Sequence, residues 1–467
     1  MNRRLTKLLT LAAAALTAWT ASTAVADPPC GTWTIVPTAD PGAETNLLVD
    51  VALTSPADGL AVGNWTGGGR SRVPMVQHWD GADWALIAAP DVSHVGTNPA
   101  IEGTGAVAGD VWITGYVDTP YPTHNLPVMA RWRDGRWDYV ATATLRKQNT
   151  YPFADRGGFG WDVDGVSDDD LWVVGTAAGY GDARAASVAM ALHYDGSKWE
   201  DVDVPIVGNR SNQFKTLSAS SSDNVWAVGI WRNTAGPYQA LIGRWDGSTW
   251  ELIGNPGEGP WTGEAEAVIA FAPDDVWVSG SFNNAADFLI HWDGAGWTAV
   301  DAGNDGRFAA FAATGPDDIW ASSPLDASFY HYDGGQWSRV EGPSIPEAQY
   351  ILRGWGMAAL DSCEVWSVGG WSDGVTQYTL AEHLTGGLDC DAIGKFSAKC
   401  RRGKLTAKIA SSLPEGTELT VARNGGDRKT ATINARGKGK VRYDVPSGRH
   451  TLSIVECPDF ERKVSCP

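Results

Sequence analysis

The chain has 467 residues, including 24 Trp and 55 Gly, and a formal net charge of −19. A chain of this length exceeds what one ordinary hydrophobic core can hold, unless the core is divided among repeats. The Gly residues lack the strict three-residue period of collagen, and a hydrophobic content of 43% excludes a wholly disordered chain.

The first 26 residues have the pattern of a secretory signal peptide. Arg3 and Arg4 precede an apolar run, and the small residues at 24–26 mark a cleavage site before Asp27. No later segment reaches the roughly 20 apolar residues that span a bilayer. The sequence therefore predicts a secreted protein without a transmembrane anchor, in a compartment where disulfides form.

A short motif recurs seven times and is clearest at 273–297. There PDDVWVSG is followed by a variable loop and then by LIHWDGAGW. In the first half, an Asp-rich turn precedes alternating apolar and small residues, which predicts a short strand. The seven copies of this half lie at 57–63, 109–115, 169–175, 223–229, 274–280, 317–323 and 363–369.

The second half of the motif reads apolar, His or Arg, aromatic, Asp, Gly and, three residues later, Trp. Asp-Gly between two apolar runs is a strong hairpin signal, because Gly supplies the positive φ of a tight turn. A further strand precedes each Asp-rich turn, so each unit has four strands in about 40 to 60 residues, as a propeller blade has. The second halves end at Trp84, Trp137, Trp199, Trp250, Trp297 and Trp337.

The two ends of the repeat region complement each other. The seventh copy lacks an outer strand with Trp, whereas the segment GTWTIV at 31–36 resembles that strand. We expect the N-terminal strand to complete the last blade and cover its edge. The predicted fold is all-β: after the signal peptide (1–26), a seven-bladed β-propeller (27–392) closed by the N-terminal strand, and then a small β-sandwich (393–467).

The first three Cys fall near the expected closure. A disulfide between Cys30 and Cys390 would lock the ring, and Cys363 is an alternative partner for either.

The last 75 residues differ in composition. They contain no Trp and have short alternating runs typical of a seven-stranded, Ig-like sandwich, in which Cys400 pairs with Cys466 or Cys457. Residues 394–467 hold 16 Lys and Arg against 7 Asp and Glu, a net charge of +9, whereas 27–393 hold 17 against 48, a net charge of −31. Either this basic module docks on the acidic propeller, or it holds an anionic surface such as a cell-wall polymer. Nucleic acid is not expected, because no aromatic residues are interleaved for stacking.

The Asp-Asp-Val-Trp-x-Val-Gly repeats resemble those of secreted bacterial propeller proteins of the galactose-oxidase/kelch-like class, over residues 30–388. Shorter units such as 297–337 also resemble tectonin-type lectin repeats. The resemblance implies a propeller fold and transfers no site. Sialidase Asp-boxes are matched only in their last residues, at 244–250, and no Cys is placed for the Tyr–Cys crosslink of a galactose-oxidase copper site.

Five of the eight His fall at one repeat position, where Arg131 and Arg244 also occur. Interchange with Arg favours a structural role over metal ligation. These His are His78, His193, His291, His331 and His383.

Carboxylates occur eight residues before the last Asp-turn position in the first three blades: Asp50, Glu102 and Asp162, with Asp164 two residues later. Neighbouring carboxylates repel unless they are screened, protonated or bound to a cation, and oxygen-rich sites suit Ca²⁺. The two interpretations are a calcium site and a hydrated acidic channel.

Several Trp fall outside the repeat pattern. Trp161 and Trp355 share one offset, and Trp261 lies in the loop before the fifth blade. Indole rings stack on sugar faces while nearby carboxylates and Arg bind hydroxyl groups. The candidate ligand-binding residues are Trp161, Asp162, Trp355, Arg353, Trp261 and Glu102; ordinary loop packing is the alternative.

The function predicted from these features is that of a secreted, monomeric, non-catalytic binding protein that recognises a glycan or a cell-surface ligand at the propeller mouth. One alternative is a hydrolase or lyase acting on polysaccharide through Asp50, Glu102 and Asp162. A second alternative is a scaffold for partner proteins.

Overall fold

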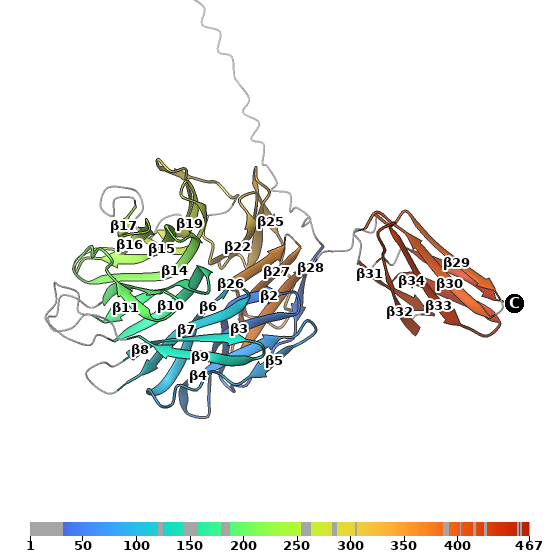
Figure 1. Cartoon of the computed structure of the whole chain (residues 1–467), viewed down its shortest axis with the longest axis horizontal. Helices are drawn as coiled ribbons and strands as arrows, with labels where there is room; N and C mark the ends of the chain where they lie inside the picture. The colour runs from blue at the N-terminus through green and yellow to red at the C-terminus, as the bar shows by residue number, and fades with distance from the viewer. Residues whose placement is uncertain are drawn as a thin grey trace, which may run out of the picture.

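The computed structural model describes residues 31–119, 125–143, 157–178, 187–253, 263–282, 287–303, 306–361, 363–385, 392–401, 403–413, 417–424, 427–454, 457, 460 to 466. The predicted signal peptide, Cys30, Cys390 and Trp261 lie outside these residues. Within them the secondary structure is β, without an α-helix, and no helix is long and apolar enough to cross a membrane. The strands form antiparallel sheets, most of them four-stranded, consistent with a β-propeller (Figure 1).

Seven of these sheets, numbered here along the chain, are built from described residues between 33 and 385. Sheet 1 contains β2 (Thr45–Ser55), β3 (Asp58–Gly67), β4 (Arg70–Trp79) and β5 (Trp84–Ile87). Sheet 2 contains β6 (Thr97–Val107), β7 (Asp110–Asp118), β8 (Asn125–Arg133) and β9 (Arg136–Thr142). Sheet 3 contains β10 (Gly158–Ser167), β11 (Asp170–Ala178), β12 (Ser187–Tyr194) and β13 (Trp199–Val202). Sheet 4 contains β14 (Ser211–Ser221), β15 (Asn224–Arg232), β16 (Gln239–Trp245) and β17 (Trp250–Leu252).

The remaining three sheets follow the same order. Sheet 5 contains β18 (Gly263–Ala272), β19 (Asp275–Phe282), β20 (Phe288–Trp292) and β21 (Trp297–Ala299). Sheet 6 contains β22 (Ala310–Gly315), β23 (Asp318–Ser323), β24 (Ser328–Tyr332) and β25 (Trp337–Val340). Sheet 7 contains β26 (Tyr350–Asp361), β27 (Glu364–Ser372), β28 (Gln377–Thr385) and β1 (Trp33–Val36).

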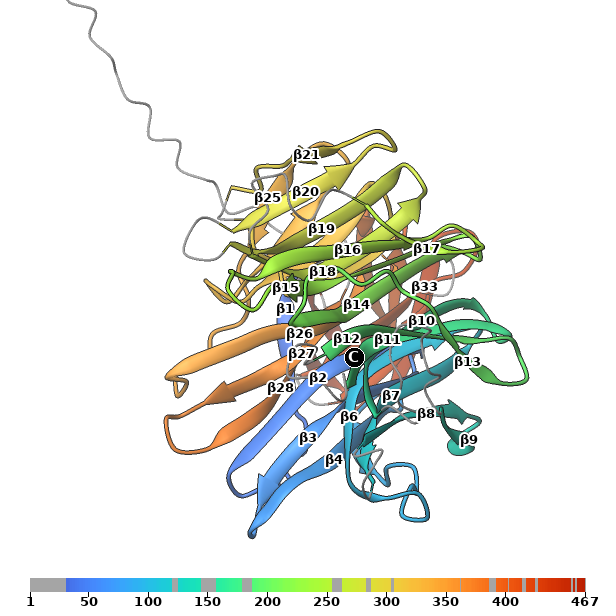
Figure 2. The ribbon, with the colours of Figure 1, turned by 90° about the vertical axis from the view of Figure 1, so that its left-hand side faces the viewer.

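The sheets follow one another around the molecule in chain order, as the colours of Figure 2 show. The first strand of each sheet contacts the first strand of the next, and β26 of sheet 7 contacts β2 of sheet 1. These seven first strands are called the inner strands below.

Tryptophan side chains fill the spaces between sheets. Trp172, on the second strand of sheet 3, has its ring centre 4.9 Å from that of Trp245 and 5.4 Å from that of Trp250 in sheet 4. Trp366 of sheet 7 lies 5.2 Å from Trp84 of sheet 1 in the same way. Each aromatic pair adds to the large apolar area that a buried indole removes from water. The repeated Trp therefore hold neighbouring sheets together.

The outer strand of sheet 7 comes from the other end of the chain. β1 pairs antiparallel with β28, with Trp33 opposite Leu384. The Trp33 side chain is buried, stacks on Phe329 at 3.7 Å and meets Trp320 of sheet 6 edge-on at 5.6 Å. Trp33 thus packs against sheet 6 as Trp84 packs against sheet 7.

The repeated His residues have a structural role, as expected. In each case Nε2 lies 2.6 to 2.8 Å from a carboxylate at the end of the Asp-rich turn in its own sheet. In sheet 4, Asn224 and Arg244 replace this pair at 3.2 Å. The pairs are Asp58 with His78, Asp170 with His193, Asp275 with His291, Asp318 with His331, and Glu364 with His383.

The C-terminal strands form two further sheets around a separate hydrophobic core. Each strand overlaps a short alternating run of the sequence. One sheet has the order β29 (Lys395–Arg401), β30 (Lys404–Ala410) and β33 (Lys438–Asp444). The other has the order β32 (Asp427–Thr432), β31 (Glu418–Arg423), β34 (Gly448–Ile454) and β35 (Glu461–Cys466).

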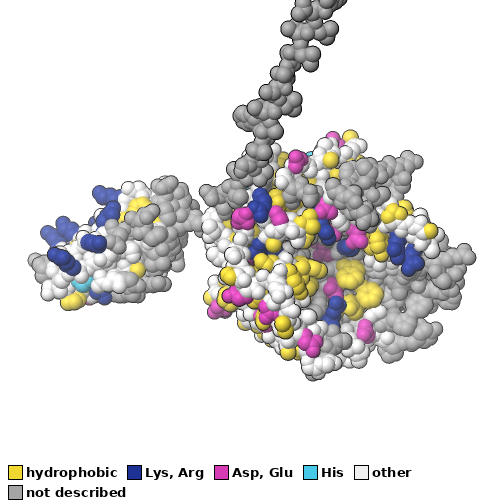
Figure 3. Space-filling model, turned by 180° about the vertical axis from the view of Figure 1, so that it is seen from behind, with side chains coloured by type: hydrophobic (Ala, Val, Ile, Leu, Met, Phe, Trp, Pro, Cys, Tyr) yellow, Lys and Arg dark blue, Asp and Glu magenta, His cyan; other side chains and the backbone are white. Residues whose placement is uncertain are grey.

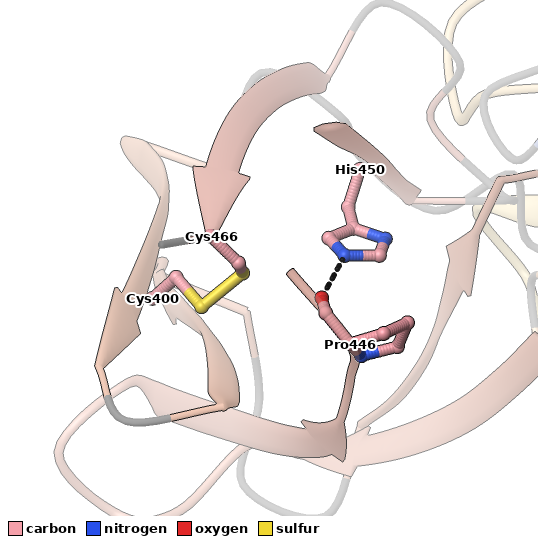
Figure 4. The surroundings of a disulfide bond; sticks show 4 residues. All are labelled: Cys400, Pro446, His450 and Cys466. Atoms are coloured by element: carbon pink, nitrogen blue, oxygen red, sulfur yellow. Dashed lines mark hydrogen bonds between the residues drawn. A yellow bond between two sulfur atoms is a disulfide. The ribbon is translucent and has the colours of Figure 1, made fainter. Parts of the chain in front are cut away.

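A disulfide joins these two sheets. Cys400 of β29 bonds to Cys466 of β35, with 5.3 Å between their Cα atoms, which confirms the first of the two predicted pairings (Figure 4). Nearby, His450 Nε2 donates a hydrogen bond to the Pro446 carbonyl at 3.0 Å. Cys363 and Cys457 are also disulfide-bonded.

Candidate functional site

The inner strands surround a cavity of about 990 Å³. In six of the seven sheets, the inner strand contains a β-bulge at one level, where its register against the second strand shifts. A bulge leaves the extra residue out of the pairing ladder and re-aims its side chain. Six residues from these bulges line the cavity and are called the bulge ring: Val49, Glu102, Trp161, Lys215, Glu266 and Trp355.

The bulge in β26 is the largest and explains the exposure of Trp355. The register jumps from Leu352 to Gly356, so three residues are left unpaired. Gly354 has a φ of +63°, a value that glycine adopts without strain. The Trp355 side chain is 47% exposed and lines the cavity, as does Leu325, which is 52% exposed.

Arg353 lies in the same bulge, but its side chain points away from the cavity. The prediction that Arg353 binds the ligand is therefore wrong. The side chain is 3% exposed and does not line the cavity. Its guanidinium bonds to Glu382, 0% exposed, at 2.8 Å, and to the Pro343 carbonyl at 2.7 Å. Burial raises the pKa of Glu382 to about 6, against the opposing effect of the Arg353 charge. Arg353 is therefore part of the packing between sheets.

Trp161 belongs to a cluster of three aromatic side chains. Its ring is nearly parallel to that of Phe159, with 6.0 Å between ring centres, and Phe159 meets Tyr116 of sheet 2 edge-on at 4.6 Å. Trp161 Nε1 donates a hydrogen bond to Thr176 Oγ1 at 3.1 Å. The indole is thus held in one orientation at the edge of the cavity.

The charged members of the bulge ring are all paired. Glu102 accepts a hydrogen bond from Arg72 at 2.6 Å. Glu266 holds Arg307, which also lines the cavity, through two bonds of 2.8 Å. Lys215 is paired with Glu264 of the next sheet at 2.7 Å. The charges are therefore fixed in place, while the side chains of these pairs keep part of their surface open to solvent.

The prediction that Glu102 lies at the level of Asp50 and Asp162 is wrong. In the pairing register, Gly103 is opposite Thr114 as Asp162 is opposite Val174. The other hairpins have a further bulge beside the turn, but the β6–β7 hairpin pairs without one up to its turn. Counting eight residues back from the turn therefore reaches a position one residue earlier in the pairing of β6 than in that of the other inner strands. Glu102 instead lies at the level of Trp161.

Partly buried aspartates on the cavity wall join neighbouring inner strands. Asp50 Oδ2 accepts the N–H of Thr104 in the next sheet at 2.8 Å. Asp162 Oδ2 accepts the Leu217 N–H at 2.9 Å and the Thr216 hydroxyl at 2.8 Å. The other carboxylate oxygen of each accepts the N–H of the following residue. Both side chains therefore act first as bonds between sheets.

Asp164 makes the same kind of bond, since its Oδ2 accepts the Ala219 N–H at 2.9 Å. Burial raises the pKa of Asp164 to about 7 and that of Asp162 to about 6, although the N–H bonds lower both. Burial, followed by repulsion from the Asp162 charge, raises the pKa of Asp50 as well. Burial also raises the pKa of Glu102, against the effect of Arg72.

The predicted calcium site has little support from this geometry. No group of three or more His, Cys, Asp or Glu side chains arranged to hold a metal ion is found among the described residues. The carboxylates proposed as ligands are Asp50, Glu102, Asp162 and Asp164. Both oxygens of each aspartate accept hydrogen bonds from N–H groups or a hydroxyl, and one oxygen of Glu102 is paired with Arg72.

Three charged residues of the cavity wall were not predicted from the sequence. Lys215 and Glu266 belong to the bulge ring. Arg307 is the ion-pair partner of Glu266 and also lines the cavity. Lys215 and Glu266 share a position with Trp161 and Trp355: each directly precedes the residue at which the inner strand resumes pairing with the second strand. That shared position could have identified them in the sequence.

No family model matches this chain. No curated protein matches it either. Among solved structures, the chain is similar to YCF48 bound to D1 peptide, at 14% identity over 77% of this chain and 98% of that one, with a TM-score of 0.48. It is also similar to the GH93 α-L-arabinofuranosidase of Fusarium graminearum in complex with arabinobiose (13% identity, 75% and 97% coverage, TM-score 0.43). A third is the SapL1 lectin in complex with α-methyl fucoside (12% identity, 64% and 97% coverage, TM-score 0.36).

Proposed function

We propose that this chain is a secreted binding protein that holds a glycan in the cavity of its inner strands, without turnover. The observation that carries the proposal is the bulge ring, which brings Trp161 and Trp355 to the wall of one cavity of about 990 Å³. This size is at the upper end of small-ligand pockets. Indole faces suit pyranose rings, and the fixed pairs of Glu102 and Glu266 offer hydrogen-bond partners for hydroxyl groups.

We propose that the seven sheets are the blades of one ring that β1 closes. The pairing of β1 with β28, the place of Trp33 against sheet 6 and the contact of β26 with β2 support this closure. Secretion is supported by the disulfide between Cys400 and Cys466, a bond typical of oxidising compartments.

Binding is favoured over catalysis because the carboxylates of the cavity are already engaged. Glycoside hydrolysis needs one carboxylate free to give a proton and another free to attack or to activate water. Asp50 and Asp162 each use both oxygens to accept N–H bonds. The raised pKa of Asp162, about 6, is the feature that keeps a hydrolase as the second candidate.

The test is a glycan array probed with residues 27–467, followed by titration and product analysis of each glycan retained. We expect Trp355→Ala to weaken binding by about tenfold, equivalent to roughly 1.4 kcal/mol of lost stacking. Leu86→Ala is the matched control, because Leu86 is 48% exposed on an outer strand and should leave affinity unchanged.

Three outcomes would contradict the proposal. Equal affinity of Trp355→Ala and the unmodified chain would remove the cavity from the binding site. Cleavage of the glycan that is lost in Asp162→Asn would establish the hydrolase instead. Retention of no glycan, together with capture of a protein partner, would favour a scaffold.

A further inference from the structure

The outward face of the sheet β29-β30-β33 is densely basic. Inward residues alternate with outward ones along each strand, and Phe396, Leu405 and Tyr443 point into the hydrophobic core. The outward positions form four cross-strand rows: Arg401, Lys404, Asp444; Lys399, Thr406, Arg442; Ser397, Lys408, Lys440; and Lys395, Ala410, Lys438.

Eight of these twelve positions are Lys or Arg, all exposed. Among the described residues of the three strands, the acidic side chain on this face is Asp444, 3.5 Å from Lys404. Both side chains of that pair are more than 60% exposed (66% and 85%), so the pair is weak. In Figure 3, Lys and Arg dominate the charged side chains in view on the C-terminal strands.

The arrangement of these charges opposes folding. Lys408 is directly opposite Lys440, and Arg401 is directly opposite Lys404. Like charges opposite each other on one face of a sheet are destabilising. A solvated surface would need only scattered charges of both signs, so this face is better explained by a partner that neutralises it.

We propose that this face binds a linear polymer bearing phosphate groups, lying along the strands. Lys438, Lys440 and Arg442 follow one another at every second residue, about 6.8 Å apart on an antiparallel strand, so a polymer can meet one cation after another. The neutral outward residues are Ser397, Thr406 and Ala410, which offer neither an apolar wedge for a bilayer nor a ring for base stacking. Recognition is therefore electrostatic, and binding releases counterions.

The inference is independent of the glycan cavity, because it uses another part of the chain and another ligand. The test measures binding of residues 27–467 to linear polyphosphate by fluorescence anisotropy over a range of salt concentrations. The variant Lys399→Gln/Lys408→Gln/Lys440→Gln removes three charges from the face. The control Arg136→Gln/Arg210→Gln/Arg449→Gln removes three exposed charges elsewhere, with Arg449 on the opposite sheet.

We expect the face variant to bind at least about tenfold more weakly and to lose about three units of the salt slope, one for each cation. The control should retain the slope. The face variant should also melt at a higher temperature than the unmodified chain, because the opposed Lys408 and Lys440 charges are gone.

Equal losses in the two variants would show that net charge alone attracts the polymer, and would overturn the proposal. Stronger binding to phosphatidylglycerol vesicles than to polyphosphate would assign the face to a membrane instead. Salt-sensitive self-association that is abolished in the face variant, without polymer binding, would assign it to the acidic sheets of a second copy.

Discussion

Asp164 should make the stability of the sheets depend on pH. Its carboxylate joins β10 to β14 by accepting the N–H groups of Gly165 and Ala219 at 2.8 and 2.9 Å. Burial raises its pKa from the ordinary value of 3.8 to about 7. Because the pKa is higher in the folded chain than in the unfolded chain, the folded chain binds this proton more tightly. Its contribution to stability is therefore full below about pH 4 and is lost as the pH rises through 7.

The change in the free energy of unfolding follows from the difference between the pKa of Asp164 in the folded and unfolded chain. About three pH units at 1.36 kcal/mol each give about 4 kcal/mol in all, of which about 3 kcal/mol falls between pH 5 and pH 8. Asp162, with a pKa of about 6, adds to the same trend. The turn aspartates with a lowered pKa, such as Asp195 and Asp246 at about 2, act only at lower pH. The sheets should therefore be more stable near pH 5 than near pH 8.

The assay is denaturant unfolding followed by Trp fluorescence. This signal reports on sheets 1 to 7 and not on the two C-terminal sheets, because residues 393–467 contain no Trp. In Asp164→Asn, the difference in stability between about pH 5 and about pH 8 should shrink by about 3 kcal/mol. Asp203→Asn, at an exposed position, removes the same charge and should keep the full difference. The reasoning is refuted if Asp164→Asn has the same pH dependence as the unmodified chain.

Three further changes test the packing. Arg353→Met leaves the Glu382 carboxylate, 0% exposed, without its cation and should lower the free energy of unfolding by about 3–5 kcal/mol, measured with denaturant. The double variant Arg353→Met/Glu382→Leu should lower it less. Equal losses in the two variants would contradict the role of the buried pair. Trp33→Ala should lower the free energy of unfolding by about 3–5 kcal/mol in the same assay. Ile35 is 43% exposed on the same strand, so Ile35→Ala should change it little. Similar losses in the two variants would contradict the role of β1. Cys400→Ser opens a loop of 66 residues and should lower the stability of the C-terminal strands by about 4 kcal/mol in calorimetry, with an unchanged transition for the sheets; an unshifted C-terminal transition would contradict this estimate.

The repeated features of the fold could be predicted from the sequence because their causes are local. An Asp-Gly pair in a hairpin fixes both the turn and the register of the strands beside it. Asp195, for example, accepts the N–H groups of Ser197 and Lys198 within its own turn. The pairing of β1 with β28 was also accessible, because GTWTIV has the pattern of an outer strand and the seventh repeat lacks one.

The candidate site was harder to predict, because its geometry depends on bulges that repeat counting does not detect. Glu102 was placed one residue off, since the turn of its hairpin has Ala108 and Gly109 both at positive φ, as a tight two-residue turn does. Arg353 and Trp355 point in different directions within a bulge of three unpaired residues, in which Gly354 has a positive φ. Nothing in the sequence alone states the length of that bulge.

The two levels of the inner strands explain why the bulge ring carries a wider range of side-chain sizes than the residues that follow it. A bulged residue is outside the pairing ladder, and at this level the sheets carry side chains as different as Val49, Glu102 and Trp161. One residue later the side chain meets the neighbouring inner strand, and a Cβ added to Gly103 would lie 2.3 Å from the Trp161 carbonyl oxygen. That next level therefore admits small residues or a carboxylate that bonds to the next strand: Asp50, Gly103, Asp162, Thr216, Ala267, Ala310 and Gly356. Substitutions in the bulge ring should thus change what the cavity holds, whereas substitutions at the next level should first loosen the contact between sheets.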